Sequence, residues 1–370
     1  MAEKSGAICC PLASSVAGQS AAPELPYLPR DPKHYRPNIG LVACGEITKD
    51  HLTAYRAAGY RVVALCDPLA HRARRRKTEF YPGAKVYRDY RDLLKRSDVE
   101  VVDLAAHPVD RAPMIEDALS AGKHVLSQKP FVLDLDFGHR MVDLADRQGV
   151  KLAVNQNGRW APHFSYIIQA VHAGLLGRVM AIHCSVHWDH SWVEGTDFEK
   201  IKHLILYDFA IHWFDLVACI MGEHRAHRVY ASMARSPAQK IAPPLLAQAL
   251  IEFDNAQASL AFDAHTRFGP LDHTYVTGDR ATIVSTGPDL KHQTVTLHTT
   301  DGRFTPELQG CWFPDGFHGA MGELLLAIEE DREPTNSARG NLHSLELCFA
   351  AATSAERNEP VEPGATRIMP

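Results

Sequence analysis

Three ionisable residues interrupt the otherwise apolar segment 204–222, LILYDFAIHWFDLVACIMG. Its pattern predicts a helix in which Asp208 and His212 share a face and Asp215 lies one turn further on. Burying such groups is unfavourable unless they have a partner or a role. The segment therefore holds either a self-satisfied Asp–His pair in the core or a general base, His212, that a carboxylate holds and tunes. No further ligand cluster occurs at suitable spacing, so we expect no metal site.

Lys129 directly follows an expected strand, His124 to Ser127, and precedes Pro130. An ammonium at the carboxyl end of a parallel strand can donate a hydrogen bond to a reacting oxygen and shift the pKa of a neighbouring acid. The alternative is a surface lysine whose stem packs on the protein while its charge stays in water. The position in the fold therefore decides between these two interpretations.

A run of aromatic and histidine residues, HWDHSW, occupies positions 187–192. The face of Trp188, with polar neighbours such as His190, suits the apolar faces and hydroxyl groups of a sugar. Tryptophan at the end of a strand is equally common as plain packing. The run is therefore a hypothesis for substrate contact.

The segment 38–67 has the pattern of a βαβ unit that could hold a nucleotide beside these residues. An apolar run ends at a glycine turn, a helical pattern follows, and a second apolar run ends at Asp67. Such a turn presents backbone N–H groups and a positive helix end to a pyrophosphate, and the acidic residue can accept from a ribose hydroxyl. Of the G-x-G-x-x-G frame only Gly45 is kept, so a plain α/β crossover remains the alternative.

Strands continue to alternate with helices as far as residue 154, which predicts a doubly wound parallel sheet of the Rossmann type. Its ligand crevice should be formed by the loops 106–108, 128–130 and 155–159. Alternating strands joined by turns after residue 160 predict an α+β part with a large, mostly antiparallel open sheet. We expect an arm or disordered tail over 1–36, a dinucleotide-binding domain over 37–158, and a substrate-binding and oligomerisation domain over 159–370.

The composition argues against a nucleic-acid-binding or membrane protein. The 370 residues are 45% hydrophobic and 22% charged, and the net charge of -5 gives no global attraction to nucleic acid or anionic membranes. No apolar run approaches the roughly 20 residues of a membrane span. The eight cysteines form no C-x-x-C pair and look like small buried hydrophobes, so we expect a cytoplasmic protein.

The order of these motifs resembles the glucose-fructose oxidoreductase, inositol dehydrogenase and rhizopine-catabolism protein family (Gfo/Idh/MocA). The resemblance runs from about Pro37 to the expected last helix, 342–358. It implies a Rossmann domain, a C-terminal domain whose open sheet usually mediates dimers or tetramers, and nicotinamide-dependent oxidation or reduction of sugars, cyclitols or related polyols. The motifs that carry it are Ile39 to Gly45 with His51, Asp67-Pro68, AGKHVLSQKP at 121–130, NQNGRWAP at 155–162, and YDFAIHWFD at 207–215.

The resemblance also implies roles for single residues. Lys129 matches the lysine of the family's E-K-P motif, Asp208 its substrate-binding aspartate, and His212 the histidine that removes the hydroxyl proton. The expected substrate contacts are Arg159, Trp188, His190, Asp208 and His212. The expected cofactor contacts are Ala43, Gly45, Glu46, Ile47, Asp67, Arg72, Ala106, His107, Pro108, Gln128, Lys129 and Asn157.

Several residues depart from the family pattern. Gln128 replaces the usual glutamate of E-K-P, Ala43 replaces the first glycine of the turn, and Glu46 places a carboxylate near the expected pyrophosphate. His107 and Ala112 stand where threonine and histidine are usual. These departures concern the cofactor more than the three catalytic candidates.

We therefore expect an NAD-dependent dehydrogenase acting on a secondary hydroxyl of a sugar, glycoside or cyclitol, active as a homodimer or homotetramer. Asp67 favours NAD, although Arg72 and Arg74 could instead meet the 2′-phosphate of NADP. Two alternatives are redox-neutral glycoside cleavage or epimerisation with retained NAD, and a non-catalytic sensor of NAD or sugar with the same fold. No nucleic acid or membrane partner is expected.

Overall fold

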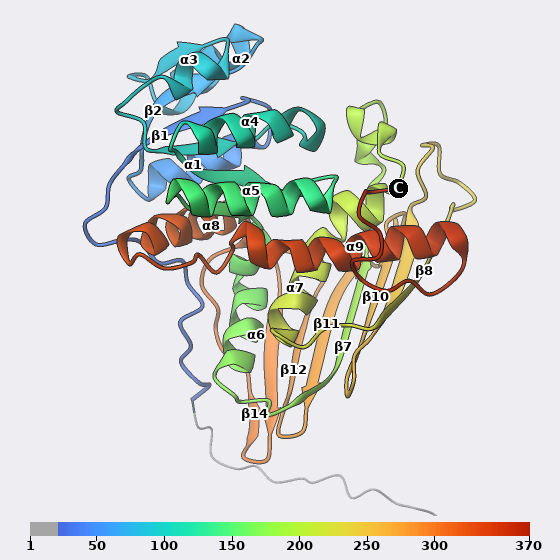
Figure 1. The fold of residues 1–370 in the computed structure, drawn as a ribbon. Helices are drawn as coiled ribbons and strands as arrows, with labels where there is room; N and C mark the ends of the chain where they lie inside the picture. Colours follow the sequence, from blue (N-terminus) through green and yellow to red (C-terminus); the bar gives the residue numbers. More distant parts are fainter. Residues whose placement is uncertain (1–20) are drawn as a thin grey trace, which may run out of the picture.

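The first sheet is parallel throughout and has the strand order β3-β2-β1-β4-β5-β6. In the computed structural model, which describes residues 21–370, helices flank this sheet (Figure 1). This arrangement confirms the predicted doubly wound Rossmann sheet. Its elements are β1 Asn38–Val42, α1 Thr48–Ala57, β2 Arg61–Cys66, α2 Ala70–Phe80, β3 Lys85–Tyr87, α3 Tyr90–Leu94, β4 Val101–Leu104, α4 Pro108–Ser120, β5 His124–Gln128, α5 Leu135–Gln148 and β6 Leu152–Asn155.

The second sheet has eight strands in the order β14-β13-β12-β11-β7-β10-β9-β8, and only the pair β7 and β10 is parallel. Along most of its strands buried residues alternate with more exposed ones, as in a sheet with one covered face. The predicted large, mostly antiparallel sheet is therefore confirmed. The strands are β7 Val179–His187, β8 Arg228–Ala234, β9 Leu246–Glu252, β10 Gln257–Asp263, β11 Leu271–Gly278, β12 Thr282–Gly287, β13 Thr294–Thr299 and β14 Gly302–Phe304.

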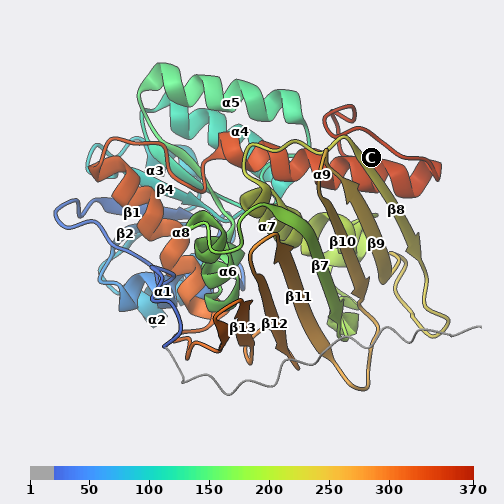
Figure 2. The ribbon, with the colours of Figure 1, turned by 90° about the horizontal axis from the view of Figure 1, so that it is seen from below.

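Helices lie on one face of this second sheet and leave the other face open (Figures 1 and 2). These helices are α6 (Pro162–His172), α7 (Ile211–Met221) and α9 (Ala338–Arg357). A 3-10 turn, η1 (Asn157–Trp160), joins β6 to α6. The inner face of the sheet and these helices form the larger of two buried apolar clusters, which also extends under the first sheet.

A helix from the end of the chain, α8 (Trp312–Glu329), packs against the first sheet. Its Phe317, Met321 and Leu324 join Ile39 and Leu41 of β1 in the second apolar cluster. The dinucleotide-binding sheet therefore completes its core with residues that are almost 300 positions away in the sequence. The boundary predicted at 158/159 remains a prediction, because packing of this kind crosses it.

The extended segment 21–36 lies along the body of its own chain. The backbone N–H groups of Lys33, His34 and Tyr35 donate to the carboxylate of Glu329 over 2.8, 2.6 and 2.7 Å. Further along, the Ser165 hydroxyl donates to the Tyr27 carbonyl over 2.6 Å. This part of the predicted arm or tail is thus an ordered arm, and residues 1–20 lie outside the described residues.

Helix boundaries differ from the predictions where proline or a local bulge intervenes. The sequence pattern predicts a helix over 113–121, whereas α4 begins at Pro108, because proline suits the first helical position. The predicted single helix over 204–222 is a π-helical stretch, η4 (Leu204–Phe209), followed by α7. In the part of the chain from residue 21 onward, no helix combines the length and apolarity needed to cross a bilayer.

Candidate active site

Lys129 and Asp208 come together between the two sheets. Lys129 follows β5 of the first sheet, and Asp208 lies in η4, which packs with α9 and with β9 of the second sheet. The Lys129 Nζ donates to the Asp208 carbonyl over 2.8 Å and to its Oδ1 over 3.1 Å. Both side chains are 18% exposed, so the pair is accessible to a small molecule while largely shielded from water. The lysine is thus not a plain surface residue.

His212 lies beside this pair, in the first turn of α7, and its side chain is buried. Burial, and secondarily the charge of Lys129, hold the pKa of His212 well below its ordinary value. Among residues 21–370, its Nδ1 has no hydrogen-bond partner. A neutral imidazole of this kind can accept a proton from a hydroxyl group.

The expected pairing of His212 with a carboxylate is not what the structure shows. Asp208 is engaged by Lys129, and no hydrogen bond within the described residues joins His212 to Asp208 or Asp215. The physical reason is the π-helical stretch, which replaces the regular i,i+4 geometry between 208 and 212. Instead, the ring is held by packing: its centroid is 5.1 Å from that of Trp312. A Cβ added at Gly158 would approach the His212 Nδ1 to 3.2 Å.

Asp215 serves a different group. Its carboxylate accepts from Arg159 Nε and Nη2, both over 2.6 Å, and from the Ser344 hydroxyl over 2.7 Å. The remaining Arg159 nitrogen, Nη1, donates to the Thr335 carbonyl. Arg159 was predicted as a substrate contact, and that role stays a prediction. In the structure its donors tie α7 and the loop before α9 to the turn after β6.

The turn after β1 is built for close approach to its backbone. An ideal Cβ at Gly45 would meet no atom of residues 21–370 within 4 Å. The next residues lead into α1, whose N-cap position, Ile47, provides no side-chain hydrogen bond. Open backbone at the N-terminus of a helix is where a pyrophosphate can bind. Ala43, which replaces the first glycine, has a φ of +67°, a conformation that favours glycine.

Asp67 closes this turn from the end of β2. Its Oδ2 accepts from the Cys44 N–H and its Oδ1 from the Leu69 N–H, both over 2.8 Å. The residue is buried. Asp67 therefore fixes the backbone of the turn, and its predicted contact with a ribose would use the remaining lone pairs of the same oxygens.

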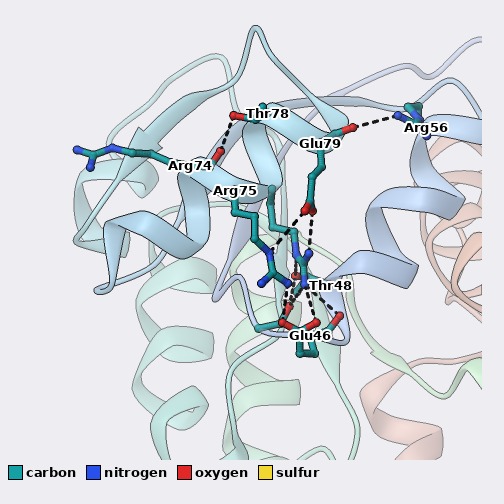
Figure 3. A network of polar contacts seen from close by, with 9 residues as sticks. Glu46, Thr48, Arg56, Arg74, Arg75, Thr78 and Glu79 are labelled. Carbon is teal, nitrogen blue, oxygen red and sulfur yellow. Dashed lines mark hydrogen bonds and ion pairs between the residues drawn. The ribbon is translucent and has the colours of Figure 1, made fainter.

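Glu46 points away from the turn toward solvent, where it pairs with arginines of α2 (Figure 3). The Arg75 Nη2 lies 2.6 Å from Glu46 Oε1, and the glutamate side chain is 82% exposed. The buried Arg76 donates to the Gly45 carbonyl over 2.9 Å and to Glu79 over 2.8 Å. Because the Glu46 charge is directed outward and neutralised, it does not oppose a phosphate group at Gly45. Arg72 and Arg74 of the same helix are exposed.

Two residues of the predicted run, Trp188 and His190, pack against Phe209, the neighbour of Asp208 in the chain. The ring centroid of Phe209 lies 4.7 Å from that of Trp188 and 5.1 Å from that of His190. Burial lowers the pKa of His190 to about 4; Asp208 raises it by a smaller amount and Lys129 lowers it further. His190 is therefore a neutral residue within electrostatic range of the pair.

The crevice loops of the first sheet are held from below by a buried arginine that the sequence analysis did not single out. Arg111 of α4 donates to the carbonyls of Ala106, Pro130 and Phe131, and burial lowers its pKa to about 10. Next to Ala106, His107 is the N-cap of α4 and Pro108 its first residue. Arg111 could have been found by the criterion that indicated Asp208, because it is a charged residue at a helix position that is expected to be buried.

Two further predicted cofactor residues are engaged by neighbours. The Asn157 Oδ1 accepts from Trp312 Nε1 over 2.8 Å, and the Gln128 Oε1 accepts from the Lys129 N–H over 2.8 Å. Both residues are buried. Their cofactor contacts stay predictions, and the structure shows them as supports of the crevice.

Comparison with known proteins agrees with this geometry. Residues 37–156 match the family model described as "Oxidoreductase family, NAD-binding Rossmann fold", and residues 164–284 match "GFO/IDH/MocA C-terminal domain". D-apiose dehydrogenase of Paraburkholderia graminis is 26% identical over 87% of this chain and 88% of its own length. Inositol 2-dehydrogenase of Burkholderia multivorans is 28% identical over 56% of this chain and 61% of its own length.

A solved structure, an oxidoreductase from Agrobacterium radiobacter in complex with NAD+, L-tartaric acid and magnesium, has the same fold. It superimposes with a TM-score of 0.80 at 20% identity, over 89% of this chain and 99% of the other. The two matched models, in their expected order, cover most of the chain. The chain therefore belongs to the Gfo/Idh/MocA family of oxidoreductases and carries that family's NAD(P)-binding Rossmann domain.

Proposed function

We propose that the protein is an NAD-dependent dehydrogenase that transfers hydride between nicotinamide and a secondary hydroxyl or ketone of a sugar, glycoside or cyclitol. One observation carries the proposal: Lys129 from the Rossmann sheet contacts Asp208 beside His212, whose Nδ1 is enclosed against Gly158, so that Nε2 is the ring nitrogen left to meet a substrate. A proton acceptor and an oxygen-binding cation thus face the crevice where a family cofactor would bind.

In the oxidative direction, the substrate hydroxyl lies between these groups. Lys129 donates a hydrogen bond to the oxygen, Asp208 accepts from a neighbouring hydroxyl and orients Lys129, and the neutral His212 takes the hydroxyl proton. A nicotinamide bound beside them would supply the hydride acceptor, while these residues hold the oxygen as the carbon–oxygen double bond forms. Reduction returns the proton from His212 to the oxygen, so the charges balance in both directions.

The residues around the turn fit a dinucleotide. Gly45 leaves open space for a phosphate, and Glu46 is directed away from it. A carboxylate at Asp67 can accept from a 2′-hydroxyl and repels a 2′-phosphate, which supports NAD over NADP. The exposed Arg72 and Arg74 are the groups that could reverse this preference.

The substrate class is supported by relatives and by the crevice. The names D-apiose dehydrogenase and inositol 2-dehydrogenase indicate a sugar and a cyclitol as substrates of those two proteins. In this chain the Trp188 ring and the buried His190 provide an apolar face with polar edges near Asp208. Sugars present the same combination of apolar ring faces and hydroxyl groups.

The test begins with the cofactor. Purified protein is denatured and any released nucleotide identified by mass spectrometry, and NAD and NADP are then titrated into the emptied protein. Binding of NAD at micromolar concentration, followed by NADH production with a sugar or polyol, is the expected result. Tightly retained NAD without NADH accumulation would point to redox-neutral chemistry instead. Failure to bind either nucleotide would refute the proposal.

We also propose that the open face of the second sheet joins two copies of the chain. Tyr230 and Leu250 are paired across β8 and β9 on that face and are 42% and 56% exposed. Apolar side chains on a face without helices are typical of an interface. Leu250→Lys should shift the mass measured by light scattering toward the monomer, whereas Glu116→Lys, at an exposed position of α4, should leave it unchanged. An equal mass for both variants would contradict this interface.

A further inference from the structure

The backbone N–H of Lys129 fixes the orientation of the neighbouring Gln128 side chain. This N–H lies 2.8 Å from Gln128 Oε1 and can only donate. The oxygen of the amide must therefore face Lys129. Its nitrogen, Nε2, then faces the other way and lies 3.2 Å from Nε2 of His51 in α1.

The protonation of His51 follows from that orientation. An amide nitrogen donates and does not accept, so His51 Nε2 must be the unprotonated, accepting nitrogen. A second amide nitrogen, Asn155 Nδ2, lies 3.2 Å from the same atom. A proton on His51 Nε2 would face both of these donors, so both the imidazolium and the other neutral tautomer are disfavoured.

The ring proton therefore resides on His51 Nδ1, where Asp103 of β4 accepts it. The two atoms, His51 Nδ1 and Asp103 Oδ2, are 2.7 Å apart, and the Tyr55 hydroxyl donates to the same carboxylate oxygen over 2.7 Å. His51, Asp103 and Tyr55 are all fully buried. The ring of Phe317 packs on His51 with its centroid 4.6 Å away.

We propose that Asp103 and His51 are positioning residues for Lys129. Asp103 selects the tautomer of His51, His51 orients the amide of Gln128, and that amide holds the backbone of Lys129, whose Nζ contacts Asp208. The inference rests on the proposed function, because it assigns this network to the placement of the catalytic lysine. It goes beyond that function by naming two residues that do not touch the reactants.

The network also explains how glutamine can stand where the family usually has glutamate. A carboxylate at 128 would need a proton on His51 Nε2, and with Asp103 on the other nitrogen the ring would have to become an imidazolium. In this chain the carboxylate lies at 103, on the opposite side of the same ring. Moving it to 128 while placing an amide at 103 would reverse both hydrogen bonds of His51 to these two residues, while the Lys129 N–H would still donate to the side chain at 128. The Asn155 amide would then turn its oxygen, which has no partner among the described residues, toward His51 Nε2.

This reversal provides the kinetic test. Asp103→Asn and Gln128→Glu, each alone, should lower kcat by about 10- to 100-fold with little change in KM, because the lysine is misplaced while the other proposed substrate contacts remain. The double variant Asp103→Asn with Gln128→Glu should be more active than either single variant. A double variant no better than the worse single one would overturn the proposal. Thermal unfolding of each variant identifies any that fail to fold.

A second measurement is independent of turnover. ¹⁵N nuclear magnetic resonance of histidine-labelled wild-type protein without ligand distinguishes the two neutral tautomers and the imidazolium, and His51→Gln identifies the resonance. We expect the Nδ1–H tautomer at neutral pH, and either other form would overturn the proposal. If the tautomer is as expected but no nucleotide binds, the proposed function fails while the hydrogen-bond relay stands.

Discussion

The turn after β1 and the crevice between the two sheets differ in whether their polar groups have hydrogen-bond partners within the described residues. At the turn, Asp67 accepts from two backbone N–H groups, and Glu46 is paired with Arg75. In the crevice, polar atoms of His212, His190 and Trp188 are buried without hydrogen-bond partners among residues 21–370.

This difference indicates what each region is for. A turn whose polar groups are satisfied by the chain itself is preorganised and can present bare backbone to a phosphate. A buried polar group without a partner is unfavourable by about 1–3 kcal/mol, so a bound molecule that supplies the missing hydrogen bond gains that free energy. We infer that the crevice is completed by substrate, whereas the turn is complete before the cofactor arrives.

The largest expected effect is at His212. Without the imidazole the proposed base for the hydroxyl proton is lost, so His212→Ala should lower kcat/KM by about 10²- to 10⁴-fold. Isothermal titration should show unchanged NAD binding. His227→Ala, which removes an exposed histidine paired with Asp254, serves as the control and should retain full activity. Similar losses in both variants would contradict the assignment.

The pH dependence should reveal the same group. Because the pKa of His212 is depressed, the base stays unprotonated through the ordinary histidine range near pH 6.5. The kcat/KM for alcohol oxidation should therefore remain level as pH falls to that value and decline only below it. A profile measured with saturating NAD checks this. An acidic limb centred above pH 6.5 would show that another group, or a differently placed His212, governs the reaction.

Gly45→Ala tests the open backbone of the turn. The new Cβ would meet no atom of the described chain, so the free energy of unfolding should hardly change. It would, however, occupy the space expected for a phosphate, and NAD binding should weaken about tenfold or more, which corresponds to about 1.4 kcal/mol. Calorimetric titration measures the affinity and urea unfolding the stability. Unaltered affinity would place the phosphates elsewhere.

Ala43→Gly should have the smallest effect. Unlike the other substitutions, it should improve a property of the protein, its stability. The left-handed backbone at Ala43 is unfavourable by about 1–2 kcal/mol for a residue with a Cβ, and glycine removes that strain. Glycine also increases the freedom of the unfolded chain, which offsets about 0.4–1 kcal/mol. Urea unfolding should show a gain in stability below about 1 kcal/mol with unaltered kcat. A destabilised variant would show that the alanine methyl group contributes packing at the turn.

Much of the fold could be predicted from the sequence, because its hydrophobic periodicity is strong. The alternation of apolar runs and helical patterns up to Asn155 corresponds to a six-stranded parallel sheet, and the alternating segments after it to the open sheet. Local boundaries were less predictable. The sequence pattern predicts a helix over 317–330, whereas α8 begins at Trp312 and contains a non-helical residue, Phe313, which no periodicity reveals.

The candidate site was only partly predictable. Lys129, Asp208 and His212 could be selected because each is an ionisable residue in an apolar or strand-end context. The supporting residues Asp103 and Arg111 were missed, although Asp103 interrupts an apolar strand in the same manner. Their roles depend on partners in other elements, and spacing along the chain does not encode which nitrogen meets which oxygen.

The sequence by itself determined the types of the chemical groups, the two sheets and the family. Side-chain periodicity and strand-end loops follow from local geometry, so they can be predicted from the order of residues along the chain. The tertiary structure alone decided that Asp208 pairs with Lys129, that Asp215 pairs with Arg159, and that His212 is left without a carboxylate. Hydrogen bonds over less than about 3 Å depend on how whole elements pack, and packing is a property of the folded chain.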